Sequence, residues 1–167
     1  SKMNPNHPLV SIAIPCYEMG GKGVKYLNFS LSKILIQNYP NIEVIISDHS
    51  KDNKIEKCVE KWNQLLNIKY IKNTYKRGSS SANINVALKH CTGDLIKILF
   101  QDDYLLEPNS LSIQVNCFIE NNAEWLATGC GHSRDHIFFE NPFSPEYSNS
   151  IIEGNNTISS PSVIMVK

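Results

Sequence analysis

Three short runs of apolar and β-branched residues constrain the fold of this chain more than any other feature. The runs are LVSIAIP at residues 9–15, IEVIIS at 42–47 and DLIKILF at 94–100. Because apolar residues dominate them without strict alternation, they are typical of strands whose two faces are both buried. Such strands belong to parallel sheets that are covered by helices on either side.

Segments with helical spacing separate these predicted strands. A weaker strand is predicted at residues 69–72, and a last apolar run, SVIMVK, occupies 162–167. Alternation of strands with helices predicts an α/β fold with a mostly parallel sheet and helices on both faces, and 167 residues fit a single domain, 1–167. The predicted helices are Val24–Leu35, Ile55–Leu66, Ile84–Leu88 and Leu111–Ile119.

The composition excludes several classes of protein. Sixteen basic residues balance sixteen acidic ones, so no net field favours nucleic acid, and none is expected as a partner. No stretch approaches the ~20 apolar residues of a membrane span, and the polar start does not resemble a secretion signal. Five scattered cysteines without a C-x-x-C pair indicate free thiols in a reducing compartment. We therefore expect a cytoplasmic location, in solution or peripheral at a membrane.

Polar side chains follow each strong strand, where ligands bind in parallel α/β sheets. Tyr17 and Glu18 follow the first strand, Asp48 the second, and Asp102 and Asp103 the third. An aromatic ring can stack on a base, one carboxylate can accept hydrogen bonds from a base or ribose, and two carboxylates can hold a divalent ion. These residue types fit a nucleotide with Mg²⁺ or Mn²⁺, whose preferred ligands are hard oxygens.

The adjacent Asp102 and Asp103 are the strongest part of this signal. Neighbouring carboxylates repel unless a positive group lies beside them. One aspartate can cap the following helix, but two seldom both do so, and a metal role is favoured for at least one. For Asp48 alone, capping is an equal alternative, and a lone Tyr17 is more often a packing residue than a stacking one.

Three segments together carry a resemblance to a known family. VSIAIPCYE, EVIISDHSKDN and TGDLIKILFQDD resemble the VSIIIPTYN-, EIIVVDDGS- and TGEYIxFLDxDD-type segments of family 2 glycosyltransferases, which have the GT-A fold. The segments occur in the family's order on predicted strands, and the resemblance covers residues 8–111. It implies inverting transfer of a sugar from a nucleotide-diphosphate sugar, commonly a UDP-sugar, to an acceptor hydroxyl, with a divalent metal, as in polysaccharide biosynthesis.

The resemblance also implies roles for individual residues, carried over by position. Asp102 falls on the metal-binding acid of the family's D-x-D motif, and Asp48 would hydrogen-bond the base. Phe100 replaces the first acid of that motif, so its contact would have to come from Asp103 or Gln101. The remaining residues implied to line or border the nucleotide-sugar site are Pro15, Tyr17, Glu18, Gly78 and Asn85.

Phe100 keeps a second function open, namely a non-catalytic nucleotide-binding module with the same fold. A dinucleotide oxidoreductase is disfavoured, because no G-x-G-x-x-G follows the first predicted strand.

The resemblance predicts two parts within the domain. Residues 8–111 would form the nucleotide-sugar-binding half, and residues 129–161, rich in Asn, Ser, Pro and Gly, would form loops toward a glycan or other hydroxyl acceptor. The family's catalytic base lies in an acidic motif farther downstream, and no residue here aligns with it. We therefore expect the protein to continue beyond residue 167.

Overall fold

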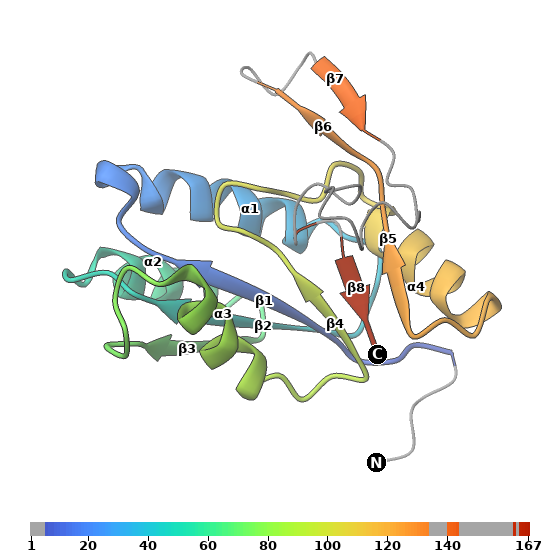
Figure 1. Cartoon of the computed structure of the whole chain (residues 1–167), viewed down its shortest axis with the longest axis horizontal. Helices are drawn as coiled ribbons and strands as arrows, with labels where there is room; N and C mark the ends of the chain where they lie inside the picture. Colours follow the sequence, from blue (N-terminus) through green and yellow to red (C-terminus); the bar gives the residue numbers. More distant parts are fainter. Residues whose placement is uncertain (1–5, 134–139, 144–161, 163) are drawn as a thin grey trace, which may run out of the picture.

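A six-stranded sheet with the strand order β3-β2-β1-β4-β8-β5 forms the centre of the molecule. The computed structural model describes residues 6–133, 140–143, 162 and 164–167. A separate two-stranded sheet pairs β6 with β7 (Figure 1). In chain order the elements are β1 (Val10–Cys16), the 3-10 helix η1 (Met19–Gly21), α1 (Gly23–Leu35), β2 (Ile42–Asp48), α2 (Lys54–Trp62), β3 (Ile68–Lys72), α3 (Ser80–Lys89), β4 (Leu95–Ile98), α4 (Ser110–Glu120), β5 (Trp125–Ala127), β6 (Cys130–His132), β7 (Glu140–Phe143) and β8 (Ile164–Val166).

The four predicted strands of the first hundred residues form the parallel part of the sheet. β1 pairs in parallel with β2 on one side and β4 on the other, and β2 pairs in parallel with β3. All seven residues of β1 are buried, as its continuous apolar run predicts. The predicted α/β fold with a mostly parallel sheet and helices on both faces is confirmed.

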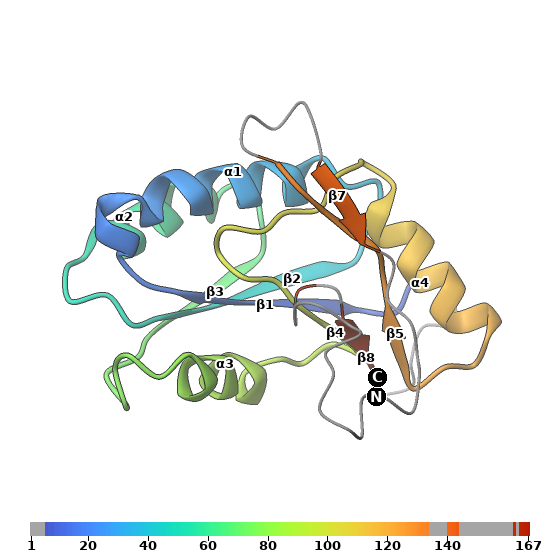
Figure 2. The same cartoon turned by 45° about the horizontal axis from the view of Figure 1, so that its top comes forward.

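Helices cover both faces of this sheet and create two unequal cores (Figure 2). The larger core joins Ile12 and Ile14 of β1 to α1, α2 and α4, through residues such as Leu31 and Leu111. The smaller core lies on the opposite face, where Ala13 and its neighbours on β2 meet Ala87 of α3. Because successive residues of a strand point to opposite faces, both faces of β1 are buried, and six of its seven residues are apolar; the polar Ser11 hydrogen-bonds to Glu43 at 2.5 Å.

The strands after residue 120 are less regular than the parallel part. The apolar run at 162–167 contains β8, as predicted, but β8 runs antiparallel between β4 and β5, with Lys97 opposite Met165. The short strands β5, β6 and β7 were not predicted. The last two fall within the region 129–161 that was expected to contain only loops.

Two further predictions from the sequence concern the cysteines and membrane-crossing helices. Cys16, Cys58, Cys91 and Cys117 are free, in agreement with the expected unpaired thiols. Among the described helices, none combines the length and apolar character of a membrane-crossing segment.

Lys97 of β4 is a charged residue in the interior of the sheet. Its side chain is 2 % exposed, and it lies beside Ile12 and Met165 in the strand registers. Burial lowers the pKa of Lys97 to about 8, while the nearby carboxylate of Asp103 opposes the shift. Desolvation of a cation costs stability, so Lys97 works against the folded state at neutral pH.

We predict that Lys97→Met stabilises the protein at pH 7 and that this gain shrinks as the pH rises. The folded pKa of about 8 lies below the ordinary lysine pKa of 10.5, so between these values the unfolded wild type binds more protons and wild-type stability rises with pH. The difference from the variant should change by on the order of 3 kcal/mol between pH 7 and pH 10.5.

Urea unfolding of both proteins across this range measures that difference, in which groups common to both proteins cancel. Lys69→Met, at an exposed position of β3, serves as the control and should give no such trend. A stability difference between wild type and Lys97→Met that stays constant with pH would contradict the prediction.

Candidate functional site

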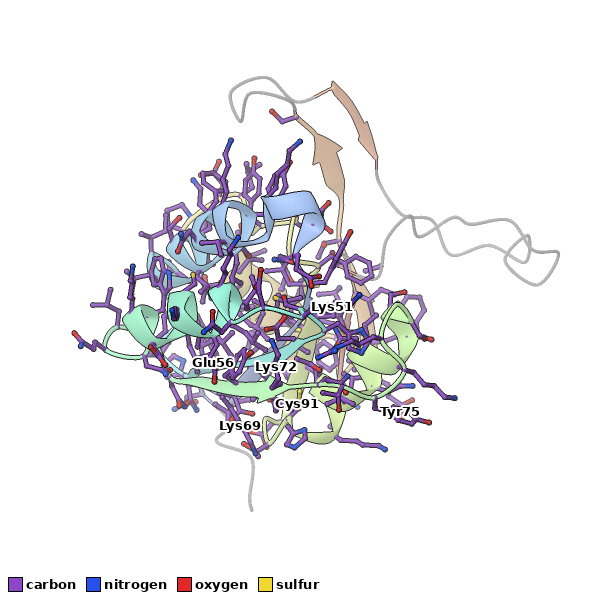
Figure 3. All side chains as sticks on the ribbon, turned by 90° about the vertical axis from the view of Figure 1, so that its left-hand side faces the viewer. Lys51, Glu56, Lys69, Lys72, Tyr75 and Cys91 are labelled. Carbon is purple, nitrogen blue, oxygen red and sulfur yellow. The ribbon has the colours of Figure 1, made fainter. Side chains whose placement is uncertain are left out.

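The C-terminal ends of the parallel strands meet at one edge of the sheet, at the left of Figure 1. Cys16 at the end of β1 is in register with Asp48 at the end of β2, which is in register with Lys72 at the end of β3. Figure 3 views the molecule from this side, and the labelled Lys51, Lys72 and Tyr75 come from β3 or from segments that follow β2 and β3. The segments that leave these strands therefore form one polar surface.

The segment after β1 presents an aromatic ring and a carboxylate. Tyr17 is 52 % exposed, although it directly follows the buried strand that contains Pro15. Glu18 accepts a hydrogen bond from the backbone N–H of Lys51, in the segment after β2. Backbone hydrogen bonds, that from Lys51 first, lower the pKa of Glu18. Glu18 is thus a fixed anion beside an exposed ring.

The segment after β4 makes a tight acidic turn. The Asp103 N–H donates to the Phe100 carbonyl at 3.0 Å, which places Gln101 and Asp102 at the two middle positions of the turn. Asp102 is exposed, Asp103 is half-buried, and Gln101 is buried. The turn therefore presents Asp102 to solvent.

A side-chain hydrogen bond connects the acidic turn to the aromatic segment. The Tyr17 backbone N–H donates to Gln101 Oε1 at 3.0 Å, across 84 residues of sequence. The structure thus brings the predicted residues Tyr17, Glu18, Asp102 and Asp103 to neighbouring segments of one edge. The sequence suggested Gln101 only as a possible replacement for the acid that is missing at Phe100. Nothing in the local sequence around Gln101 indicates a contact with Tyr17.

Asp48 occupies a different environment from the one its predicted role requires. Its side chain is fully buried, and Oδ1 accepts from the Ser50 N–H at 2.8 Å. Oδ2 accepts from the Tyr70 hydroxyl at 2.7 Å and lies 3.4 Å from Lys72 Nζ. Burial, with the hydrogen bond to Asp48, raises the pKa of Tyr70. With both oxygens engaged inside the protein, Asp48 is placed to organise the end of β2 rather than to reach a base.

The helix α3 places Asn83 at the strand ends, whereas the predicted site residue on this helix is Asn85. Asn83 is buried, accepts from Ser47 Oγ at 2.6 Å and donates to the Cys16 carbonyl at 3.1 Å. Asn73, after β3, donates to the same Asn83 oxygen at 3.1 Å. Asn85 is instead exposed and lines a surface hollow of about 560 Å³ along α3. Because Asn83 and Asn85 are two residues apart on a helix, their side chains lie on different faces. The resemblance to the family's sequence segment does not show this difference.

Gly78 lies in the segment that leads into α3. Its φ of +89° is a left-handed conformation that suits glycine, and nothing lies within 4 Å of an added Cβ. The following Ser79 caps α3 by accepting from the Ala82 N–H at 3.3 Å. Gly78 is therefore an exposed turn residue whose backbone sets the direction of the helix.

The described residues contain no group of three or more His, Cys, Asp or Glu side chains that could enclose a metal ion. Asp102 nevertheless offers an exposed carboxylate, a ligand type that Mg²⁺ and Mn²⁺ accept. Such ions are often held by one or two carboxylates together with substrate phosphates and water. The donor set therefore fits an ion that arrives with a phosphorylated ligand better than a permanently bound one.

Comparison with known proteins places these observations in a family. The sequence model of Glycosyl transferase family 2 matches residues 11–161. An uncharacterized glycosyltransferase of Rickettsia typhi is 28 % identical over 131 residues, which cover 78 % of this chain and 38 % of the relative. An uncharacterized glycosyltransferase of Haemophilus influenzae is 31 % identical over 121 residues, which cover 70 % of this chain and 45 % of the relative. The chain thus spans less than half the length of either protein.

A solved structure shows the same fold with a ligand bound. The crystal structure of S. aureus TarS 1-349 in complex with UDP-GlcNAc is 25 % identical and superposes with a TM-score of 0.67. The match covers 76 % of this chain and 36 % of that one. A family model that matches most of the chain, with related glycosyltransferases and a shared fold, leads to one assignment: the chain belongs to glycosyl transferase family 2.

Proposed function

We propose that this chain forms the donor-binding part of a glycosyltransferase that transfers a sugar from a nucleotide-diphosphate sugar to an acceptor hydroxyl with inversion. A UDP-sugar is the proposed donor, and Mg²⁺ or Mn²⁺ is the proposed cofactor. A glycan is the proposed acceptor, with a role in polysaccharide biosynthesis. The related TarS structure, which contains UDP-GlcNAc, supports the choice of a UDP-sugar.

One observation carries this proposal. At the edge of a parallel sheet where ligands usually bind, a hydrogen bond connects an exposed aromatic segment to an exposed acidic turn. Tyr17 and Asp102 come from segments that the Tyr17–Gln101 hydrogen bond ties together. An aromatic ring beside an acidic turn supplies the two contacts that a nucleoside diphosphate with a metal ion needs, namely stacking and a carboxylate ligand.

The residues have distinct proposed roles. Tyr17 stacks on the base, Glu18 and Asp103 accept hydrogen bonds from ribose or sugar hydroxyls, and Asp102 holds the metal. Pro15 and Gly78 shape the backbone of segments beside the proposed donor site, and Asn85 borders it less directly than the family pattern implies. When bound, a divalent ion supplies positive charge that stabilises the departing diphosphate.

In the inverting reaction of the resembled family, a carboxylate deprotonates the acceptor hydroxyl. We assign this role to no described residue, because no residue of this sequence aligns with the family's acidic motif. Residues 8–111 are proposed to carry donor binding and residues 129–161 to face the acceptor. Most of the latter range lies outside the described residues.

The competing function is a non-catalytic nucleotide-binding module. Phe100 favours it, because Phe100 stands where the resembled motif has its first acid and its side chain offers no oxygen to a metal or a ribose. Metal-dependent hydrolysis of UDP-GlcNAc by the full-length protein would separate the two functions. A catalyst releases UDP slowly even without acceptor, whereas a binding module releases none.

We predict that Tyr17→Ala and Asp102→Asn weaken UDP binding in different ways. Tyr17→Ala should weaken it by about tenfold both with and without Mn²⁺, because stacking does not need the ion. Asp102→Asn should leave metal-free binding unchanged and remove most of the increase caused by Mn²⁺. Isothermal titration calorimetry measures both. Equal losses from both variants in metal-free buffer would contradict the assignment.

We predict that Asp48→Asn lowers stability without changing base preference. The substitution removes a buried charge that faces Lys72 and the Tyr70 hydroxyl, which should reduce the free energy of unfolding by about 1–3 kcal/mol. The ratio of UDP to CDP affinity should stay at its wild-type value. Asp52→Asn, which alters a more exposed carboxylate in the next turn, is the control for stability.

Urea unfolding and competitive titration of the two nucleotides provide these measurements. A changed UDP-to-CDP ratio with unchanged stability would show instead that Asp48 contacts the base directly.

A further inference from the structure

The buried side chain of Gln101 holds both ends of the aromatic segment. Gln101 is 2 % exposed; its Oε1 accepts from the Tyr17 N–H at 3.0 Å and its Nε2 donates to the Gly23 carbonyl at 2.8 Å. Because the Tyr17 N–H donates and the Gly23 carbonyl accepts, the amide uses both its oxygen and its nitrogen. A flipped amide would lose both hydrogen bonds. Residues 17–23 are therefore clamped at their first and last positions by one side chain.

Gly23 is the matching part of this clamp. A Cβ at this position would lie 2.9 Å from Gln101 Nε2 and 2.4 Å from the Tyr17 carbonyl oxygen, both closer than real Cβ contacts. Between the clamped ends, Met19, Gly20 and Gly21 all have positive φ. The tight path of the segment thus depends on a glycine that leaves room for the Gln101 amide.

Gln101 also belongs to the acidic turn itself. The hydrogen bond from the Asp103 N–H to the Phe100 carbonyl makes Gln101 and Asp102 consecutive middle residues of one turn. Because adjacent residues in a tight turn share a peptide plane, the contacts that hold Gln101 also set the backbone of Asp102. One buried amide therefore connects the backbone under the proposed stacking residue to that under the proposed metal ligand.

We propose that Gln101 is a positioning residue that couples the Tyr17 segment to the Asp102 turn, so that metal and nucleotide strengthen each other's binding. This inference rests on the proposed function, because coupling requires both ligands to bind. When one ligand restricts the motion of its segment, the hydrogen bonds of Gln101 restrict the other segment as well. Binding of the second ligand then costs less conformational entropy. By reciprocity, nucleotide should raise metal affinity by the same factor.

The test uses variants that open the clamp from either side and one matched control. Gln101→Met keeps the size of the side chain and removes both hydrogen bonds. Gly23→Ala introduces a methyl group against the Tyr17 carbonyl oxygen and the Gln101 amide, so it disturbs the clamp from the other side. Gln114→Met makes the same chemical change at another buried glutamine, in α4, whose Oε1 has no hydrogen-bond partner within the described part of the chain.

The first measurement is the factor by which Mn²⁺ tightens UDP binding, from calorimetric titrations with and without the ion. The wild type and Gln114→Met should show a factor of at least about five, within the usual range of coupling between sites. Gln101→Met and Gly23→Ala should show a smaller factor, because the contact of the ion with Asp102 and the phosphates remains while the clamp is lost. A factor that is unchanged in a folded Gln101→Met overturns the proposal, even if this variant melts at a lower temperature. If Gln101→Met does not fold, Gly23→Ala decides the question in the same way.

The second measurement needs no ligand. Hydrogen exchange of the Tyr17 amide should be faster in Gln101→Met than in the wild type or in Gln114→Met, since this amide loses its acceptor. Equal exchange rates overturn the clamp. If the wild type binds no UDP with or without Mn²⁺, the proposed function fails and the coupling fails with it, while Tyr17 exchange still shows whether Gln101 holds the segment.

Discussion

The pairing of β1 with two parallel neighbours is the constraint on which the rest of the structure depends. Because β1 is hydrogen-bonded to β2 and β4 and covered by helices on both faces, each of its seven residues is buried. Parallel pairing also sends the chain out of β1, β2 and β4 at the same edge. The apolar strand that builds the core thereby determines where Tyr17, Asp48 and the acidic turn are placed.

Neutral amides, more than charges, fix the segments at that edge. Gln101 spans from the acidic turn to residues 17 and 23, and Asn83 spans from α3 to β1 and β2. A buried amide can satisfy one donor and one acceptor without the desolvation cost of an ion. The backbone segments of the exposed residues Tyr17 and Asp102 are thus connected by buried hydrogen bonds.

The charged residues of the interior show the limits of assigning a role from residue type. Asp48 follows a strand, as a ligand-binding acid would, yet Ser50, Tyr70 and Lys72 use both of its oxygens. Lys97 lies in a predicted strand and is buried despite its charge. The sequence correctly predicted that Asp48 follows a run of strand residues and that Lys97 lies within a strand. Whether a side chain faces solvent or the interior depends on elements that are distant in sequence.

The sequence by itself determined the α/β class, the parallel strands, the family and the edge at which Tyr17, Glu18 and the acidic turn gather, because apolar runs, helical spacing and ordered motifs are local properties of the chain. It did not reveal that Asn83 rather than Asn85 meets the strands, that β8 runs antiparallel between β4 and β5, or that Gln101 clasps Gly23. Those features are hydrogen bonds and strand pairings between residues that are distant in the sequence, such as Asn83 and Cys16 at 67 positions and Gln101 and Gly23 at 78. Tertiary structure decided them, because only packing of the helices on the sheet brings such partners within reach.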